Sequence, residues 1–177
     1  CWMGASFFLR SMVSPQQKPG QVKCINSISW ITVLLTAGSF AGMLLGPKGI
    51  IGKNWYWLGH QGWEFMEPGK LWQIMLGIVF ILWAITLYRG IRPVMKLKLP
   101  WDLPNWLVYA TFSIIILLIS GFIATPKTNF VIADFWRWMV VHMWAEAFFE
   151  VFTTVLIGYF MVQMGLVNRK AATRVIY

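Results

Sequence analysis

Residues 25–46 contain no charged side chain over about 22 positions. A helix rises about 1.5 Å per residue, so a run of this length covers the hydrocarbon core of a bilayer, which takes about 20 residues. Further apolar runs at 71–88, 106–124 and 135–167 are separated by segments rich in proline, glycine and charge. The pattern predicts four complete transmembrane helices, and residues 1–13 read as a partial helix before them.

The composition agrees with a membrane protein. Of the 177 residues, 58% are hydrophobic and 12% are charged, and the mean hydropathy is +0.63. A soluble domain of this size needs more polar side chains to cover its surface, so we expect the excess apolar residues to face the lipid bilayer. The predicted fold is all-α: a polytopic transmembrane helix bundle that forms one membrane domain over residues 1–177.

The basic residues carry information on topology. The net charge is +9, and basic clusters lie at residues 10–23, 89–98 and 169–174, in alternate connections between the apolar runs. Because positive residues are retained on the cytoplasmic side, these three segments are expected to be cytoplasmic, and residues 47–70 and 125–134 to lie on the outer side. The basic residues do not form the pattern of a nucleic-acid groove, so no nucleic-acid partner is expected.

The chain begins with Cys1, and its first residues are already apolar. We read no signal peptide there and expect an internal fragment of a longer chain, cut inside a helix at one end and in a loop at the other. Cys1 and Cys24 lack metal-type spacing, and no disulfide is expected. Gly38, Gly42 and Gly46 recur every four residues, which predicts that a neighbouring helix packs closely against this face.

The last apolar run contains the strongest signal for a functional site. His142, Glu146 and Glu150 are spaced by four, which places them along one stripe of a helix at membrane depth. An ionisable group there costs ~2.5 kcal/mol or more and is functional by default. Spacing alone leaves three interpretations open. The stripe binds a metal through imidazole and carboxylate, with further ligands from other helices; it relays protons without a metal; or it pairs with a neighbouring helix as a polar seam.

Two motifs resemble one known family. Residues 136–150 read WRWMVVHMWAEAFFE, which is similar to the large subunit of nitric oxide reductases, in the haem–copper oxidase superfamily. Residues 57–65 (WLGHQGWEF) and 69–73 (GKLWQ) resemble the quinol-dependent, single-chain branch. The resemblance covers essentially the whole chain. It implies part of a core of 12 or more helices in a bacterial or archaeal cytoplasmic (inner) membrane.

The resemblance also implies an activity: reduction of NO to N2O at a haem and non-haem iron centre, with electrons from quinol. By position, His142 and Glu146 match two ligands of the non-haem iron, and Glu150 matches a glutamate behind it that helps deliver protons. Glu64 matches a ligand of a structural calcium, and Arg137 is a candidate partner of haem propionates. The other iron ligands and the ligands of two haems b are expected in the rest of the parent chain, so the fragment alone is expected to be inactive.

One position separates the branches of the superfamily. Its oxidases carry a tyrosine four residues after the first ligand histidine, where this chain has Glu146, and an acidic oxygen ligand suits iron better than copper. The alternatives are a nitric oxide dismutase-like relative, a dioxygen-reducing haem–copper oxidase and, from another class, a non-catalytic membrane scaffold or ion-conducting subunit. His60 matches no ligand and is expected to be a hydrogen-bonding loop residue. The alternative for Arg137 is an interfacial side chain that reaches toward water.

Overall fold

The computed structural model describes residues 19–46, 49–62, 67–95 and 101–176. Four segments of this part are helices long and apolar enough to cross a membrane: Val22–Leu45, Lys70–Val94, Leu103–Ile123 and Phe130–Gln163. Their mean hydropathies lie between 1.5 and 2.3. No strand is formed by the residues described. The predicted all-α transmembrane bundle is confirmed, and the partial helix expected at residues 1–13 lies outside the described residues.

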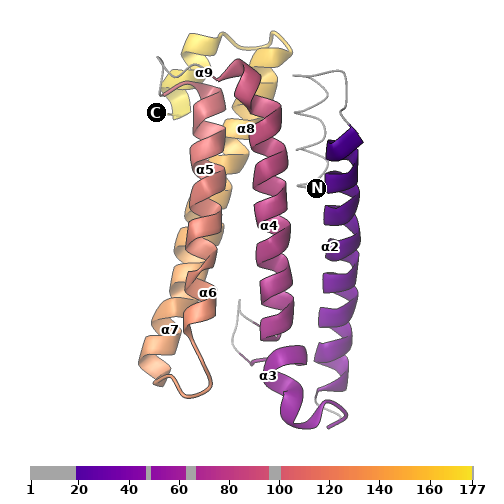
Figure 1. Cartoon of the computed structure of the whole chain (residues 1–177). Coiled ribbons are helices and arrows are strands. Elements are labelled where there is room, and N and C mark those ends of the chain that lie inside the picture. The colour runs from indigo at the N-terminus through magenta and orange to yellow at the C-terminus, as the bar shows by residue number, and fades with distance from the viewer. Residues whose placement is uncertain (1–18, 47–48, 63–66, 96–100, 177) are drawn as a thin grey trace.

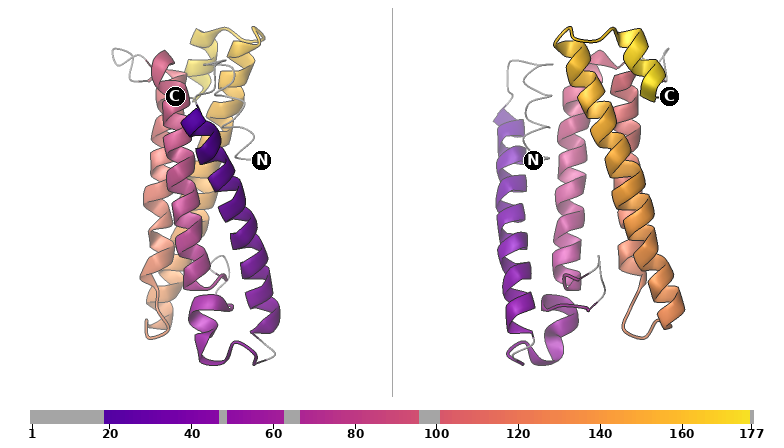
Figure 2. Two further views of the ribbon diagram at one scale, coloured as in Figure 1. Left: turned by 45° about the vertical axis from the view of Figure 1, so that its right-hand side comes forward. Right: turned by 180° about the vertical axis from the view of Figure 1, so that it is seen from behind.

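The four long helices lie side by side and alternate in direction (Figure 1). Helix α2 (Pro19–Leu45) packs against α4 (Lys70–Ile91), and α4 packs against α5 (Leu103–Leu118). The fourth is continuous through α7 (Phe130–Trp138), a π-helical segment η3 (Met139–Phe149) and α8 (Glu150–Gln163). Both η3 and α8 pack against α5, and Figure 2 shows the long helix crossing in front of α5 when the bundle is seen from behind.

The hydrophobic core lies between α4, α5 and α8. Its largest fully buried apolar side chains are Leu87 and Ile91 of α4, Leu103, Leu107 and Ile114 of α5, and Phe152 and Val155 of α8. Helix α2 contributes Ile28 to this core and exposes large apolar side chains such as Trp30 and Phe40. An exposed apolar face of this kind suits lipid or further helices, because in water it would be a large unfavourable surface.

The glycine face of α2 allows a close approach. A Cβ on Gly42 would lie 1.9 Å from the carbonyl oxygen of Leu58, and a Cβ on Gly38 would lie 2.1 Å from the ring of Trp72. The indole of Trp72 donates a hydrogen bond to the same Leu58 oxygen at 3.0 Å. The predicted packing role is therefore confirmed for Gly38 and Gly42. Gly46 lies after the end of α2, and within the described residues a Cβ there would meet the Gly42 oxygen at 3.0 Å.

Several predicted helix ends are displaced by a few residues. Helix α5 begins at Leu103 instead of residue 106, because Asp102 caps it. The fourth long helix begins at Phe130 instead of residue 135. Asn129 caps this start, because its side-chain oxygen accepts a hydrogen bond from Val131 N. It ends at Gln163 instead of residue 167, close to Gly165, which adopts φ +73°. Helix α4 continues to Ile91 instead of residue 88.

Short helices occupy the connections. Segments η1 (Gly52–Asn54) and α3 (Trp55–Leu58) lie between α2 and α4, η2 (Arg92–Val94) extends α4, α6 (Ser120–Ile123) continues α5, and α9 (Arg169–Ile176) follows α8. The start of α2, the end of α4 and all of α9 lie at one end of the bundle, here called the basic end (Figure 1). Its described basic residues are Lys23, Arg89, Arg92, Arg169, Lys170 and Arg174. The opposite end, with α3 and the start of α7, is called the far end.

Candidate metal-binding helix

The helix that carries His142 and Glu146 is π-helical over the 11 residues Met139–Phe149. In a π-helix the backbone bonds run from residue i to i+5, and such turns occur mostly as single-turn bulges, frequently at functional sites. The packing fits this wider register, because Trp144 and Phe149, five residues apart, have ring centroids 5.1 Å apart. Trp144 also meets Phe80 of α4 at 5.8 Å. This aromatic cluster anchors the wide turns against the core.

Within η3 the two predicted iron ligands lie together. His142 Nε2 is 3.8 Å from Glu146 Oε2, and the side chains are 51% and 56% exposed. The exposure is large for ionisable groups in the middle of a membrane helix, since isolated charges at that depth are costly. The pair therefore lies on a face that the described residues leave open.

The orientation of the imidazole suits a metal ligand. His142 Nδ1 lies 3.3 Å from the backbone oxygen of Trp138, and the two rings are in contact with centroids 4.4 Å apart. A metal-bound histidine commonly donates one ring N–H to a backbone carbonyl, which leaves the other nitrogen as the ligand. Here Nδ1 faces the carbonyl, and Nε2 faces the carboxylate of Glu146. The donor set of one imidazole nitrogen and one carboxylate oxygen fits iron or another borderline divalent metal.

Two ligands do not make a complete site. Among the described residues there is no group of three or more histidine, cysteine, aspartate or glutamate side chains that could hold a metal ion. The structure thus brings together His142 and Glu146, and the remaining ligands of any metal have to come from other parts of the protein.

Glu150 follows the π-helical segment as the first residue of α8. It lies on the rim of a shallow, open surface hollow that is also lined by Phe149, Thr153 and Thr154. Its side chain is exposed, as are those of His142 and Glu146. The structure places the carboxylate one turn beyond the His142–Glu146 pair, next to this surface hollow.

Three further residues that the sequence singled out belong to the far end of the bundle. Glu64, the expected calcium ligand, lies outside the described residues. Arg137 pairs with Asp134, with both Nε and Nη2 at 2.8 Å from Oδ1, and its guanidinium lies 5.3 Å from the Trp138 ring centroid. His60 Nδ1 accepts a hydrogen bond from Gly62 N at 2.8 Å, which confirms its expected role as a hydrogen-bonding loop residue.

A comparison with known protein families matches the whole chain, residues 1–177, to the family described as cytochrome c and quinol oxidase polypeptide I. The chain belongs to this family. Its members are membrane oxidoreductases with haem and metal centres, in agreement with the ionisable pair on a membrane helix. In a comparison with curated proteins, none matches the chain. Family membership establishes the haem–copper oxidase superfamily, and the particular reaction has to be argued from the residues on η3.

One buried cation was missed by the sequence analysis. Lys70, at the start of α4, is only 5% exposed, and its ammonium donates to Gln73 Oε1 at 3.1 Å and to the backbone oxygen of Gly121 at 3.0 Å. The ammonium also lies 6.0 Å from the ring of Tyr56, and burial raises the pKa of the Tyr56 hydroxyl, which stays neutral. Lys70 therefore ties α4 to α6 at the far end. A lysine beside an apolar run looks like an interface residue, so no sequence signal indicated its burial.

A second unpredicted contact joins Asp102 and Arg169 at the basic end. Asp102 is 6% exposed; its Oδ1 accepts hydrogen bonds from Leu103 N at 3.1 Å and Arg169 Nε at 2.9 Å, and its Oδ2 pairs with Arg169 Nη2. An aspartate just before Leu-Pro is a signature of a helix start and could have revealed the cap. The partner, 67 residues later, could not be found from local sequence.

Proposed function

We propose that this member of the cytochrome c and quinol oxidase polypeptide I family is part of a quinol-dependent nitric oxide reductase of a bacterial or archaeal inner membrane. The reaction joins two NO molecules with two electrons and two protons to give one N2O and one water. Quinol supplies the electrons. The proposal concerns the full-length protein, since the described chain offers two metal ligands.

The observation that supports this proposal is the contact between His142 and Glu146. Their nitrogen and oxygen atoms are 3.8 Å apart on the same open face of the helix. A carboxylate one turn after the histidine supplies a hard oxygen donor, which suits iron better than copper. The resemblance of residues 136–150 to nitric oxide reductases supports the same choice over dioxygen-reducing relatives.

The roles of the residues follow from their chemistry. His142 Nε2 and a carboxylate oxygen of Glu146 would hold the non-haem iron, with Nδ1 of His142 steadied by the carbonyl of Trp138. Iron bound there would supply a Lewis acid for the developing charge. Glu150, exposed beside an open surface hollow, would hold a proton on its carboxylate and pass it toward that site through water.

Other assignments belong to the same proposal. Two haems b would be held by residues outside this fragment. Glu64 would bind a structural calcium, for which a carboxylate is a preferred ligand. Arg137 would contact a haem propionate; its pairing with Asp134 already holds the guanidinium at the far end, at the start of the helix that carries the iron ligands.

The test is the activity of the purified full-length protein with a quinol donor. We expect NO consumption with one N2O formed per two NO, and loss of this activity in His142→Ala and Glu146→Ala. Met143→Ala is the matched control, because it changes the neighbouring side chain of the same π-helical segment without removing a ligand atom. Rapid oxygen uptake without NO consumption would assign the chain to dioxygen reduction, and release of O2 from NO would assign it to a dismutase.

A further inference from the structure

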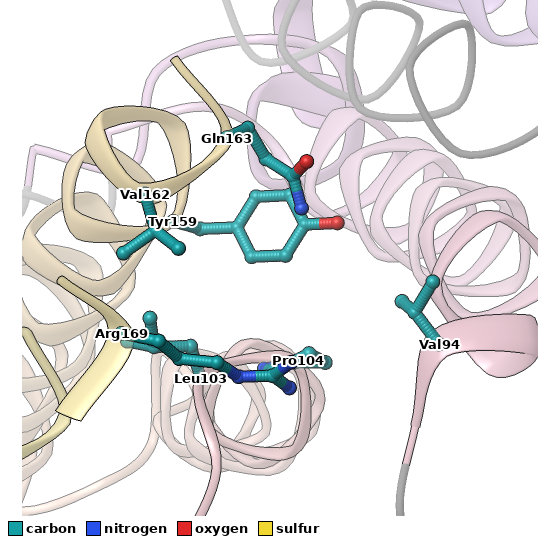
Figure 3. A pocket seen from close by; sticks show the side chains of 7 residues that line it. All are labelled: Val94, Leu103, Pro104, Tyr159, Val162, Gln163 and Arg169. Atoms are coloured by element: carbon teal, nitrogen blue, oxygen red, sulfur yellow. The ribbon is translucent and has the colours of Figure 1, made fainter. Parts of the chain in front are cut away.

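A cavity of about 90 Å³ lies at the basic end between η2, α5, α8 and α9. Its apolar lining is formed by Val94, Leu103, Pro104 and Val162. Three polar side chains complete the wall: Tyr159, Gln163 and Arg169. Figure 3 shows Tyr159 and Gln163 on one side of the space and Arg169 on the other. The volume has room for a few water-sized groups.

The tyrosine hydroxyl in this cavity is buried next to the Gln163 side chain. Tyr159 is 3% exposed, and its Oη makes no hydrogen bond of normal geometry within the described residues. A buried hydroxyl whose hydrogen bonding is incomplete is unfavourable, so such groups usually bind something. The hydroxyl lies beside the amide of Gln163 and faces the cavity (Figure 3).

All three polar side chains can donate hydrogen bonds into the same space. Tyr159 offers an O–H and Gln163 an amide N–H. Arg169 uses Nε and Nη2 for Asp102 and retains further N–H groups, since a guanidinium carries five. A ligand that satisfies them has to present several acceptor oxygens close together.

The surrounding charge favours an anion. Among the described residues, Asp102 is the acidic side chain of the basic end, and it is already paired with Arg169. The basic side chains there are Lys23, Arg89, Arg92, Lys170 and Arg174 besides Arg169. The cavity also lies where the apolar spans end, at Val94, Leu103 and Gln163, which is the depth of the lipid headgroups.

We propose that this cavity binds the phosphate group of an anionic phospholipid, with the Tyr159 hydroxyl, the Gln163 amide and the Arg169 guanidinium as donors. The apolar lining then contacts the glycerol side of the headgroup. The bound lipid bridges α5, α8 and α9 at the basic end. This inference is independent of the reaction proposed above.

The test uses the delipidated full-length protein and three probes: phosphatidylglycerol, phosphatidylcholine and inorganic phosphate. In a native mass spectrometry titration we expect phosphatidylglycerol to bind tightest, and Tyr159→Phe to weaken the first bound copy about tenfold, as for one lost hydrogen bond to a charged group. Tyr109→Phe, at an exposed tyrosine of α5 that does not line the cavity, should leave binding unchanged.

Thermal unfolding of the lipid-free protein supplies a second readout. Without lipid, Tyr159→Phe should change the Tm little, because the hydroxyl makes no hydrogen bond of normal geometry within the described residues. With phosphatidylglycerol, the variant should gain less in Tm than the parent. Unchanged phosphatidylglycerol affinity in Tyr159→Phe overturns the proposal. Equal stabilisation by inorganic phosphate at the same concentration also overturns it, because the cavity would then take a free anion.

Discussion

The guanidinium of Arg169 on α9 donates hydrogen bonds to both carboxylate oxygens of Asp102, the residue that caps the start of α5. The same carboxylate caps α5 through Leu103 N. One buried aspartate therefore fixes the start of one transmembrane helix and the position of the short helix that follows another. Because bidentate pairs are geometrically specific, Asp102 helps to determine how α5 and α9 pack at the basic end.

Replacing Asp102 should loosen this end of the bundle. Asp102→Ala removes the cap and the ion pair, and we expect a loss of about 2 kcal/mol: roughly 1 from the cap and roughly 1 from the pair. The second figure is small because the Arg169 side chain is 44% exposed and solvent screens the pair. Asp102→Asn retains a capping oxygen and should lose about half as much. Thermal unfolding of the full-length protein in detergent measures both. Equal losses would contradict a separate contribution from the cap, and no loss in Asp102→Asn would contradict a contribution from the ion pair.

The close contact of α2 with α3 gives a second stability prediction. Gly42→Ala would place a Cβ 1.9 Å from the Leu58 oxygen, so the two segments have to separate. Overpacking of this kind costs about 1–3 kcal/mol. Gly20→Ala is the matched control, since no atom lies within 4 Å of its added Cβ. Alanine there should be neutral or stabilising, because it is the better helix former. Equal Tm values for the two variants would show that the contact carries no stability.

The length of the apolar runs was enough to predict the bundle, because in lipid such a segment can form all of its backbone hydrogen bonds only as a helix. Gly38 and Gly42 predicted that a neighbouring helix packs closely against this face of α2. The same local signals did not show the π-helical turns around His142, because these depend on Trp144 packing against Phe80. The burial of Lys70 and the pairing of Asp102 with Arg169 are likewise tertiary contacts between distant parts of the chain.

For the candidate site, the four-residue spacing placed His142 and Glu146 on one face, and the structure brings them within 3.8 Å. Spacing could not show that Nδ1 of His142 faces the Trp138 carbonyl. That contact depends on the rotamer of His142, which the spacing does not determine.

The orientation of the chain in the membrane is a separate prediction. Positive-inside topology places residues 89–104 in the cytoplasm. In a full-length background without other reactive cysteines, Lys96→Cys should resist a membrane-impermeant thiol reagent in intact cells and react after permeabilisation. Lys127→Cys, in the opposite connection and exposed, should react in intact cells. The reverse labelling pattern would invert the topology.

Calcium binding by Glu64 can be measured by metal analysis. Carboxylate oxygens are preferred calcium ligands, so Glu64→Ala should lower the calcium content of the full-length protein and loosen its haems. Glu67→Ala is the control, because it removes a nearby carboxylate of the same segment that the proposal does not assign to calcium. Calcium content that stays at the parent level in Glu64→Ala refutes the assignment.

The last prediction separates the roles of the three ionisable residues on the long helix. His142 and Glu146 are in reach of one ion. Glu150 is eight residues from His142 and lies one turn beyond the pair, at the start of α8, so it is not expected to share ligand distances of about 2 Å. In the full-length protein, His142→Ala should therefore lose the non-haem iron and keep both haems. Glu146→Ala should weaken iron binding and abolish NO reduction.

Glu150→Gln should keep the iron but slow turnover, because the amide cannot carry a proton. The iron-to-haem ratio, measured beside NO consumption in the three variants and in Met143→Ala, decides between the roles. Loss of iron in Glu150→Gln with retention in Glu146→Ala would reverse the assignment. An iron ratio that none of the variants changes would leave the stripe as a proton relay or a packing seam. Turnover then distinguishes these two interpretations. If the stripe is a proton relay, Glu150→Gln slows turnover. If it is a packing seam, the variant lowers the Tm and leaves the turnover per folded protein unchanged.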